Sequence, residues 1–185
     1  MATKKVFVAG FGGQGVLMIG KMAAMSGMEN GKEVSWLPAY GSEMRGGTAT
    51  CSVNICDDPV DSPMILRPTT LIVMNLPSLL KFEKNLVPGG VMILNSSLVE
   101  QEPTRTDITV YKVPFNDLAT QAGNERGMNM LVAGVYAAIR GIITLDNLYD
   151  AIDHAFEGPK AKFIPGNKAM AKLGYDYGVE HFCQK

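Results

Sequence analysis

The glycine turn near the N-terminus constrains the fold of this chain more than any other segment. Residues 5–9 have the character of a buried strand, and Gly10, Gly12 and Gly15 then match the pattern G-x-G-x-x-G. An apolar-rich stretch with helix character follows over residues 16–28. Glycines at these positions permit a tight turn and a close approach of another backbone or a ligand. The segment therefore predicts a strand–turn–helix unit of an α/β fold.

The rest of the chain alternates between predicted strands and helices. Further strands are predicted at residues 34–37 (ending at Pro38), 48–55, 71–75, 91–95 and 108–113. Helices are predicted at residues 77–85, from Asn124 to about Gly141, from Thr144 to about Gly158, and from Asn167 towards His181, with Asn124 and Thr144 as N-caps. This alternation predicts a three-layer, Rossmann-like α/β fold with a mostly parallel sheet and helices on both faces. At 185 residues we expect one domain over residues 1–185.

The glycine turn allows several functions. The N-terminus of a helix offers unpaired N–H groups and a partial positive charge, which suit a phosphate. A dinucleotide site needs a carboxylate about 20 residues further on, but residues 35–38 (Ser-Trp-Leu-Pro) contain none, and no Gly-Lys-Ser/Thr follows the turn. Close packing of strand and helix, contact with a phosphate or pantetheine group, and a buried subunit contact all remain open.

A second glycine-rich loop covers residues 40–47. Glu43 and Arg45 are two residues apart, and Gly41, Gly46 and Gly47 flank them. As an exposed ion pair they would contribute about 0–1 kcal/mol to stability. In a shaped loop, both side chains could instead serve a binding site.

Composition excludes several classes of function. The 17 basic and 18 acidic residues leave a formal net charge of -1, so nothing in the charge favours nucleic acid or an anionic membrane as a partner. No apolar run reaches the roughly 18–20 residues of a spanning helix. The N-terminal MATKKVFVAG fits a first strand better than a signal peptide, which predicts a cytoplasmic location.

The cysteines and histidines argue against a metal centre in this chain. Cys51, Cys56 and Cys183 form no C-x-x-C pair, and the only histidines are His154 and His181. Such a sparse, odd set is typical of reduced thiols rather than of a disulfide framework or a zinc or iron–sulfur site. We assign no catalytic residue and no metal ligand.

Several motifs together resemble a known family. They are GFGGQGV at residues 10–16, AYGSEMRGGTATCSVNI at 39–55, and the segments 75–82, 88–90, 95–97 and 123–124. In order and spacing they resemble the gamma subunit, or gamma-type domain, of pyruvate, 2-oxoglutarate and 2-oxoisovalerate ferredoxin oxidoreductases.

The resemblance implies a role inside a multisubunit enzyme. Such enzymes decarboxylate a 2-oxoacid on thiamine diphosphate, pass two electrons through iron–sulfur clusters to ferredoxin, and form an acyl-CoA. By the resemblance, thiamine diphosphate and the clusters belong to partner subunits (alpha, beta and delta), ferredoxin is reached through the complex, and the isolated chain is inactive, with a homodimer possible. The form of residues 43–49 favours 2-oxoglutarate, with pyruvate and 2-oxoisovalerate as alternatives. A scaffold that binds no small molecule and a self-sufficient nucleotide-dependent enzyme are the rival interpretations.

The resemblance also implies a set of site residues. Gly12, Gly13, Gln14 and Gly15 are expected near coenzyme A or the subunit junction. Arg45 would pair with a phosphate or an interface carboxylate, while Glu43, Gly46 and Gly47 would shape the second loop.

Overall fold

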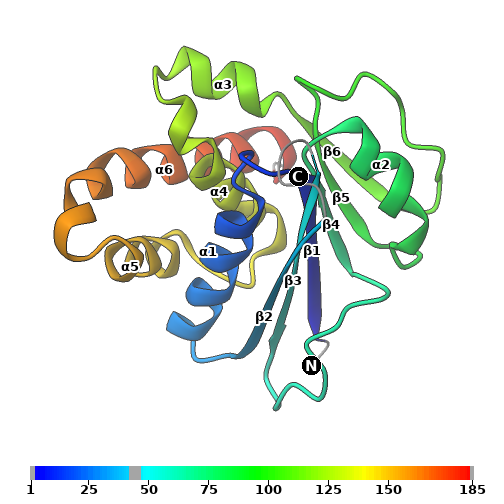
Figure 1. Ribbon diagram of the computed structural model, residues 1–185, viewed down its shortest axis with the longest axis horizontal. Coiled ribbons are helices and arrows are strands. Elements are labelled where there is room, and N and C mark those ends of the chain that lie inside the picture. Colours follow the sequence, from blue (N-terminus) through cyan, green and yellow to red (C-terminus); the bar gives the residue numbers. More distant parts are fainter. Residues whose placement is uncertain (1–2, 42–46, 184–185) are drawn as a thin grey trace.

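A computed structural model describes residues 3–41 and 47–183 and contains a six-stranded sheet of order β2-β3-β1-β4-β5-β6 (Figure 1). The strands are β1 (Lys4–Phe11), β2 (Glu33–Tyr40), β3 (Thr48–Cys56), β4 (Thr70–Val73), β5 (Val91–Asn95) and β6 (Thr109–Val113). Strands β1, β4, β5 and β6 pair in parallel, while β3 is antiparallel to both β1 and β2. The predicted mostly parallel sheet is therefore confirmed.

The second strand is longer than predicted. We expected it to end at Pro38, but β2 continues to Tyr40, with Pro38 opposite Cys51 of β3. Proline cannot donate a backbone hydrogen bond, and it is tolerated in a strand mainly at the edge of a sheet. Because β2 is an edge strand, the prediction of a stop at Pro38 was wrong.

Helices connect the strands, and their ends follow local sequence signals. They are α1 (Val16–Glu29), α2 (Leu76–Phe82), α3 (Phe115–Gln121), α4 (Met128–Arg140), α5 (Leu145–Ala155) and α6 (Ile164–Phe182), with the 3-10 segments η1 (Glu83–Asn85), η2 (Glu125–Gly127) and η3 (Gly158–Phe163). The predicted caps are confirmed: Thr144 caps α5 in a capping box with Asn147, and the side chain of Asn124 caps η2, which leads into α4. Gly141 ends α4 in the left-handed conformation.

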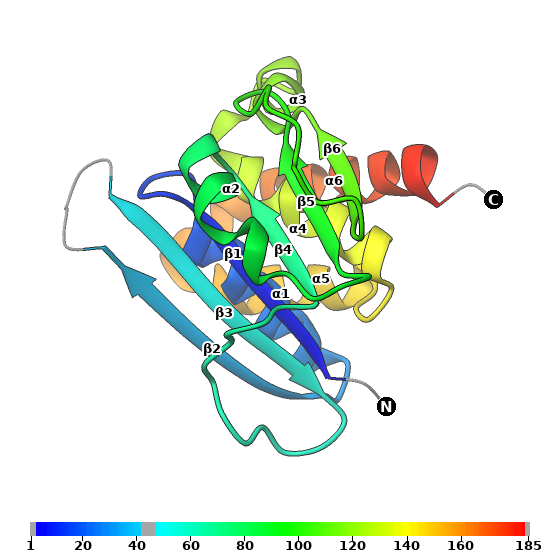
Figure 2. The ribbon, with the colours of Figure 1, turned by 90° about the vertical axis from the view of Figure 1, so that its right-hand side faces the viewer.

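The two faces of the sheet are covered unequally. Helices α1, α3, α4, α5 and α6 lie on one side, and α2 lies on the other (Figure 1). The larger core contains Ile19 of α1, Ile55 of β3 and Tyr136 of α4. A smaller core under α2 contains Leu71 of β4, Leu79 of α2, Met92 of β5 and Leu86, which follows η1. On this side of the sheet β2 and β3 extend beyond α2 (Figure 2).

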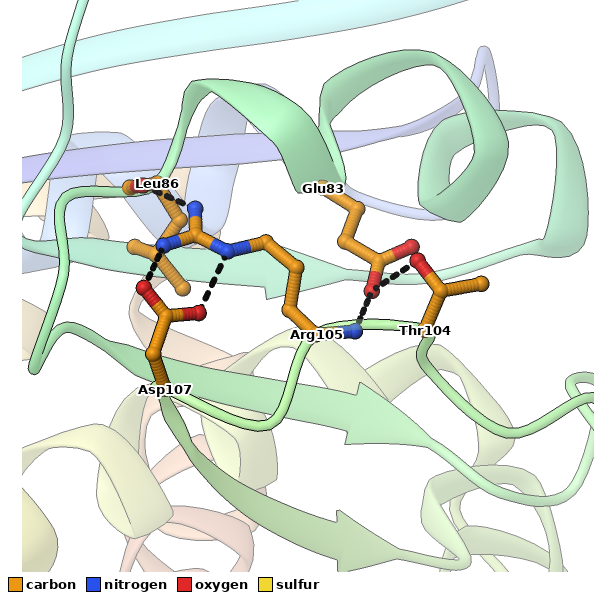
Figure 3. Close-up of polar contacts among 5 residues, drawn as sticks. All are labelled: Glu83, Leu86, Thr104, Arg105 and Asp107. Atoms are coloured by element: carbon orange, nitrogen blue, oxygen red, sulfur yellow. Dashed lines mark hydrogen bonds and ion pairs between the residues drawn. The ribbon is translucent and has the colours of Figure 1, made fainter.

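A polar cluster fastens the segment after β5 to the end of α2 (Figure 3). Oε1 of the buried Glu83 accepts hydrogen bonds from Arg105 N (2.8 Å) and Thr104 Oγ1 (3.2 Å). The Arg105 guanidinium pairs with the Asp107 carboxylate and donates to the carbonyl oxygen of Leu86. This segment therefore helps α2 to cover the smaller core.

Candidate functional site

The connections out of β1 and β4 separate at the carboxyl ends of these neighbouring strands. The chain leaves β1 through α1 on one face of the sheet and leaves β4 through α2 on the other face (Figure 1). A sheet that divides its connections in this way has a switch point, and ligands of open α/β sheets commonly bind there. The glycine turn lies at this point.

The two glycine loops meet in space. The N–H of Gly12 donates to the carbonyl oxygen of Gly47 at 3.3 Å, so the first loop contacts the end of the second. Gly13 and Gly15 have φ angles of 95° and 75°, a left-handed region that favours glycine. The N–H groups of Gly13 and Gly15 donate to no backbone carbonyl among the described residues. Together with the first N–H groups of α1, they can donate hydrogen bonds to an anionic group.

The glycines of the turn differ in what surrounds them. A side chain on Gly12 would meet no atom within 4 Å, whereas one on Gly15 would approach Asn129 Cβ at 2.8 Å. A side chain on Gly10 would collide with Gln14, Val16 and Met74. Gly10 and Gly15 are therefore required by packing, and Gly12 leaves exposed backbone open to a ligand or a partner.

Gln14 holds the turn in place through its side chain. Oε1 accepts from Phe11 N at 2.7 Å and from Asn75 Nδ2 at 3.0 Å, while Nε2 donates to Met74 O at 3.2 Å. These bonds join the turn to the end of β4. Gln14 is expected near coenzyme A or the subunit junction, and that stays a prediction. In the structure its amide is engaged within the protein, where it positions the turn.

Sequence reasoning missed the asparagines that extend this network. Asn75 caps α2 through Ser78 N at 3.0 Å, and Asn95 donates to Met74 O at 3.3 Å and to Asn116 Oδ1 at 2.9 Å. Asn75 follows β4 closely and Asn95 ends β5. Two asparagines at the ends of neighbouring parallel strands were a signal that could have located this edge.

The second loop is described only at its ends. Glu43, Arg45 and Gly46 lie outside the described residues, and Gly47 is brought to the glycine turn. A groove of about 510 Å³ lies beside Gly47, between the strands β2 and β3 and the end of α2. Its lining includes Thr50 and Lys81.

The thiols do not converge on a metal site. Cys51 lies in the larger core, where burial raises the pKa of its thiol to about 12. Cys56 is five residues further along β3 and so faces the opposite side of the sheet, and Cys183 follows α6. Among residues 3–41 and 47–183, no group of at least three His, Cys, Asp or Glu side chains could hold a metal ion. None of the helices described there is long and apolar enough to cross a membrane.

Curated proteins of similar sequence are subunits of 2-oxoacid enzymes. The ketoisovalerate oxidoreductase subunit VorA of Methanothermobacter marburgensis is 36% identical over 175 residues, which cover 94% of this chain and 36% of the relative. The 2-oxoglutarate synthase subunit KorC of Methanocaldococcus jannaschii is 28% identical, and the match covers 96% of this chain and 95% of that protein. The chain thus spans little more than a third of the VorA proteins, 36% and 37% of their lengths.

Solved structures share the fold, and a family model covers most of the sequence. The gamma subunit of a keto/oxoacid ferredoxin oxidoreductase from Geobacter sulfurreducens superposes with a TM-score of 0.84 at 24% identity, covering 97% of this chain and 98% of that one. The 2-oxoglutarate:ferredoxin oxidoreductase of Magnetococcus marinus, solved with coenzyme A bound, gives 0.81 at 19% identity over 97% of this chain and 31% of that one. The model of the pyruvate ferredoxin/flavodoxin oxidoreductase family matches residues 5–177, and the chain belongs to this family.

Proposed function

We propose that this chain is the gamma-type subunit or domain, over residues 1–185, of a cytoplasmic 2-oxoacid:ferredoxin oxidoreductase. The complex would convert a 2-oxoacid, coenzyme A and oxidised ferredoxin into an acyl-CoA, CO2 and reduced ferredoxin. Family membership and the similarity to KorC over nearly the whole of both proteins support this role. Alpha, beta and delta subunits would supply the remaining parts.

We propose that the chain contributes to coenzyme A binding at the subunit junction. The observation that carries this proposal is the Gly12–Gly47 hydrogen bond, which joins the two loops at the switch point of the sheet. Exposed backbone at Gly12 and Gly13 and the first N–H groups of α1 would receive an anionic part of coenzyme A. Gln14 would hold this backbone in place, and Arg45 of the second loop would add a cation.

The redox cofactors would belong to partner subunits. Cys51 and Cys56 face opposite sides of the sheet and Cys51 is buried, so these thiols do not fit a cluster. Thiamine diphosphate would supply decarboxylation chemistry in the alpha and beta subunits. This chain would bind and orient coenzyme A and assist assembly, with no proton transfer by its own side chains.

The identity of the 2-oxoacid stays a prediction. The sequence favoured 2-oxoglutarate, and KorC is named for that acid, but the more identical VorA is named for ketoisovalerate. Profiling the native complex against 2-oxoglutarate, 2-oxoisovalerate and pyruvate decides between them. We expect 2-oxoglutarate to give the highest kcat/KM, and a preference for 2-oxoisovalerate would contradict this.

Gly12→Val tests the coenzyme A proposal in the reconstituted complex. The new side chain begins in open space, so folding should be retained while ligand approach is blocked. We expect KM for coenzyme A to rise by about tenfold, equivalent to about 1.4 kcal/mol, with KM for the 2-oxoacid unchanged. Ala169→Val, on an exposed position of α6, is the control. An unchanged KM for coenzyme A in a fully assembled complex would favour a scaffold that binds no small molecule.

A turnover assay separates the subunit from a self-sufficient enzyme. The purified chain, supplied with 2-oxoacid, coenzyme A, thiamine diphosphate and a viologen acceptor, should show no turnover until partner subunits are added. Sustained turnover by the chain alone would refute the subunit role.

A further inference from the structure

A second pocket lies behind the glycine turn, on the helical side of the sheet. It has a volume of about 420 Å³ and is formed by η2 and the start of α4, the connection from α5 through η3 to α6, and Met18 of α1. Pockets of about 300–1,000 Å³ commonly bind small molecules. Asn129 joins the pocket to the turn, because it lines the pocket and also packs against Gly15.

The pocket has an excess of positive charge. Arg126 and Lys162 line it from different segments, and the lining residues include no carboxylate. Neither cation makes an ion pair with any residue in the described part of the chain. Two cations that converge on one concavity without acidic partners suit a ligand that carries a phosphate, which a guanidinium can bind in two-point fashion.

The remaining walls suit a planar ring. Phe156 and Phe163 line the pocket, and Phe163 is 50% exposed with Lys162 Nζ 5.2 Å from the centre of its ring, which leaves Phe156 as the aromatic wall without a cation over it. Asn129 and Asn167 add amide groups that can donate to or accept from the polar edge of a heterocycle. Asn129 Oδ1 accepts from Met130 N at 2.9 Å, which leaves its Nδ2 group to donate.

We propose that this pocket binds a nucleoside phosphate, with the phosphate between Arg126 and Lys162 and the base against Phe156. An aromatic surface, amides and paired cations in one concavity are the combination that a phosphorylated base requires. The ligand is either a free nucleotide or the nucleotide portion of a larger cofactor. The site is separate from the open backbone of Gly12 and does not depend on the function proposed for that backbone.

Calorimetric titration of the full chain with AMP tests this inference. We expect saturable binding that weakens as salt is raised. Arg126→Gln and Lys162→Gln should each weaken AMP binding by about tenfold, because each removes a charge-assisted contact to the phosphate. Lys160→Gln is the matched control, since Lys160 lies in the same 3-10 segment but does not line the pocket. Its Kd for AMP should stay within about twofold of the original value.

Other ligands and variants complete the test. Adenosine and inorganic phosphate should each bind at least about tenfold more weakly than AMP, because each lacks one half of the recognised group. Competition between AMP and coenzyme A would identify the nucleotide portion of that cofactor as the ligand, and AMP binding without competition would identify a free nucleotide. Gly12→Val should leave AMP binding intact even if it weakens coenzyme A binding. The proposal is overturned by absence of saturable AMP binding, by phosphate binding as tightly as AMP, or by equal losses in Lys160→Gln and Lys162→Gln while circular dichroism shows all variants folded.

Discussion

The side chain of Gln14 makes three hydrogen bonds, and two of them cross from the glycine turn to residues 74 and 75. Its atoms satisfy backbone groups on both sides of the switch point. Removing this side chain takes the Oε1 acceptor from two donors in a partly buried setting, Phe11 N and Asn75 Nδ2, while Met74 O keeps the hydrogen bond from Asn95. A buried donor without a partner costs more than the hydrogen bond itself contributes.

Gln14→Ala should therefore destabilise the chain by about 1–3 kcal/mol. Urea unfolding followed by circular dichroism measures the loss. Gln101→Ala, on the exposed segment after β5, should change the free energy of unfolding by less than about 0.5 kcal/mol. Equal stability of the two variants would mean that the Gln14 network is not needed to hold the turn.

The Arg105–Asp107 ion pair should make the stability of the fold depend on pH in the acid range. Hydrogen bonds from the Arg105 guanidinium lower the pKa of the Asp107 carboxyl below its usual value in the folded protein. The unfolded chain therefore binds this proton at a higher pH than the folded chain does. The stabilisation is complete above the unfolded pKa of about 3.9, and it is lost as pH falls from there through the folded pKa.

Asp107→Asn should flatten this pH dependence. The variant should be less stable than the original protein at pH 7, and it should lose less stability between about pH 5 and pH 2. Urea midpoints at several pH values measure both effects, with the exposed Asp61→Asn as the control. Parallel pH profiles for the original protein and Asp107→Asn would contradict the prediction.

At the scale of elements, local signals predicted where most helices and strands lie. A helix cap depends on only a few neighbouring residues, so the predicted ends hold: helices or 3-10 segments begin after Gly15, Asn124 and Thr144, and α4 ends at Gly141. The end of β2 was missed because the tolerance of Pro38 depends on edge position, which only the assembled sheet defines. The joining of Gly12 to Gly47, and the role of Gln14, depend in the same way on contacts between distant segments.

The close contact between α4 and α6 leads to a further prediction, about the free energy of unfolding. A side chain on Gly174 of α6 would meet Leu131 O at 2.0 Å, and one on Gly134 of α4 would meet Ala171 O at 2.1 Å. The two helices therefore pack with their backbones close together. Gly174→Ala should separate them and lower the free energy of unfolding by about 1–3 kcal/mol, the usual cost of overpacking.

Gly166→Ala is the matched control for this helix pair. Gly166 also lies in α6, but an added methyl group would meet only Asn124 Nδ2, at an ordinary 3.6 Å. We expect this variant to be as stable as the original protein or slightly more stable, since alanine favours helix. If urea unfolding gave the same loss for Gly174→Ala and Gly166→Ala, close helix contact would not be the cause.

The whole molecule has a sheet with one thickly covered face and one thinly covered face. Five helices lie on the side of the larger core, while the smaller core is covered by α2, η1 and the segment held by Glu83 (Figures 1 and 2). Local opening is easiest where few apolar contacts hold an element. The α2 side should therefore open without unfolding of the rest.

Native-state hydrogen exchange measures this difference. Amides of residues 76–86 should exchange with a lower opening free energy than those of α4, which includes the buried Val132 and Val135. Glu83→Ala removes the acceptor of Arg105 N and Thr104 Oγ1, so it should speed exchange in residues 76–86 and 96–108 while α4 changes little. Equal opening free energies on both sides, or equal acceleration in α4, would mean that the two cores unfold as one unit. If the α2 side opens separately, the larger core still supports α1 and the glycine turn.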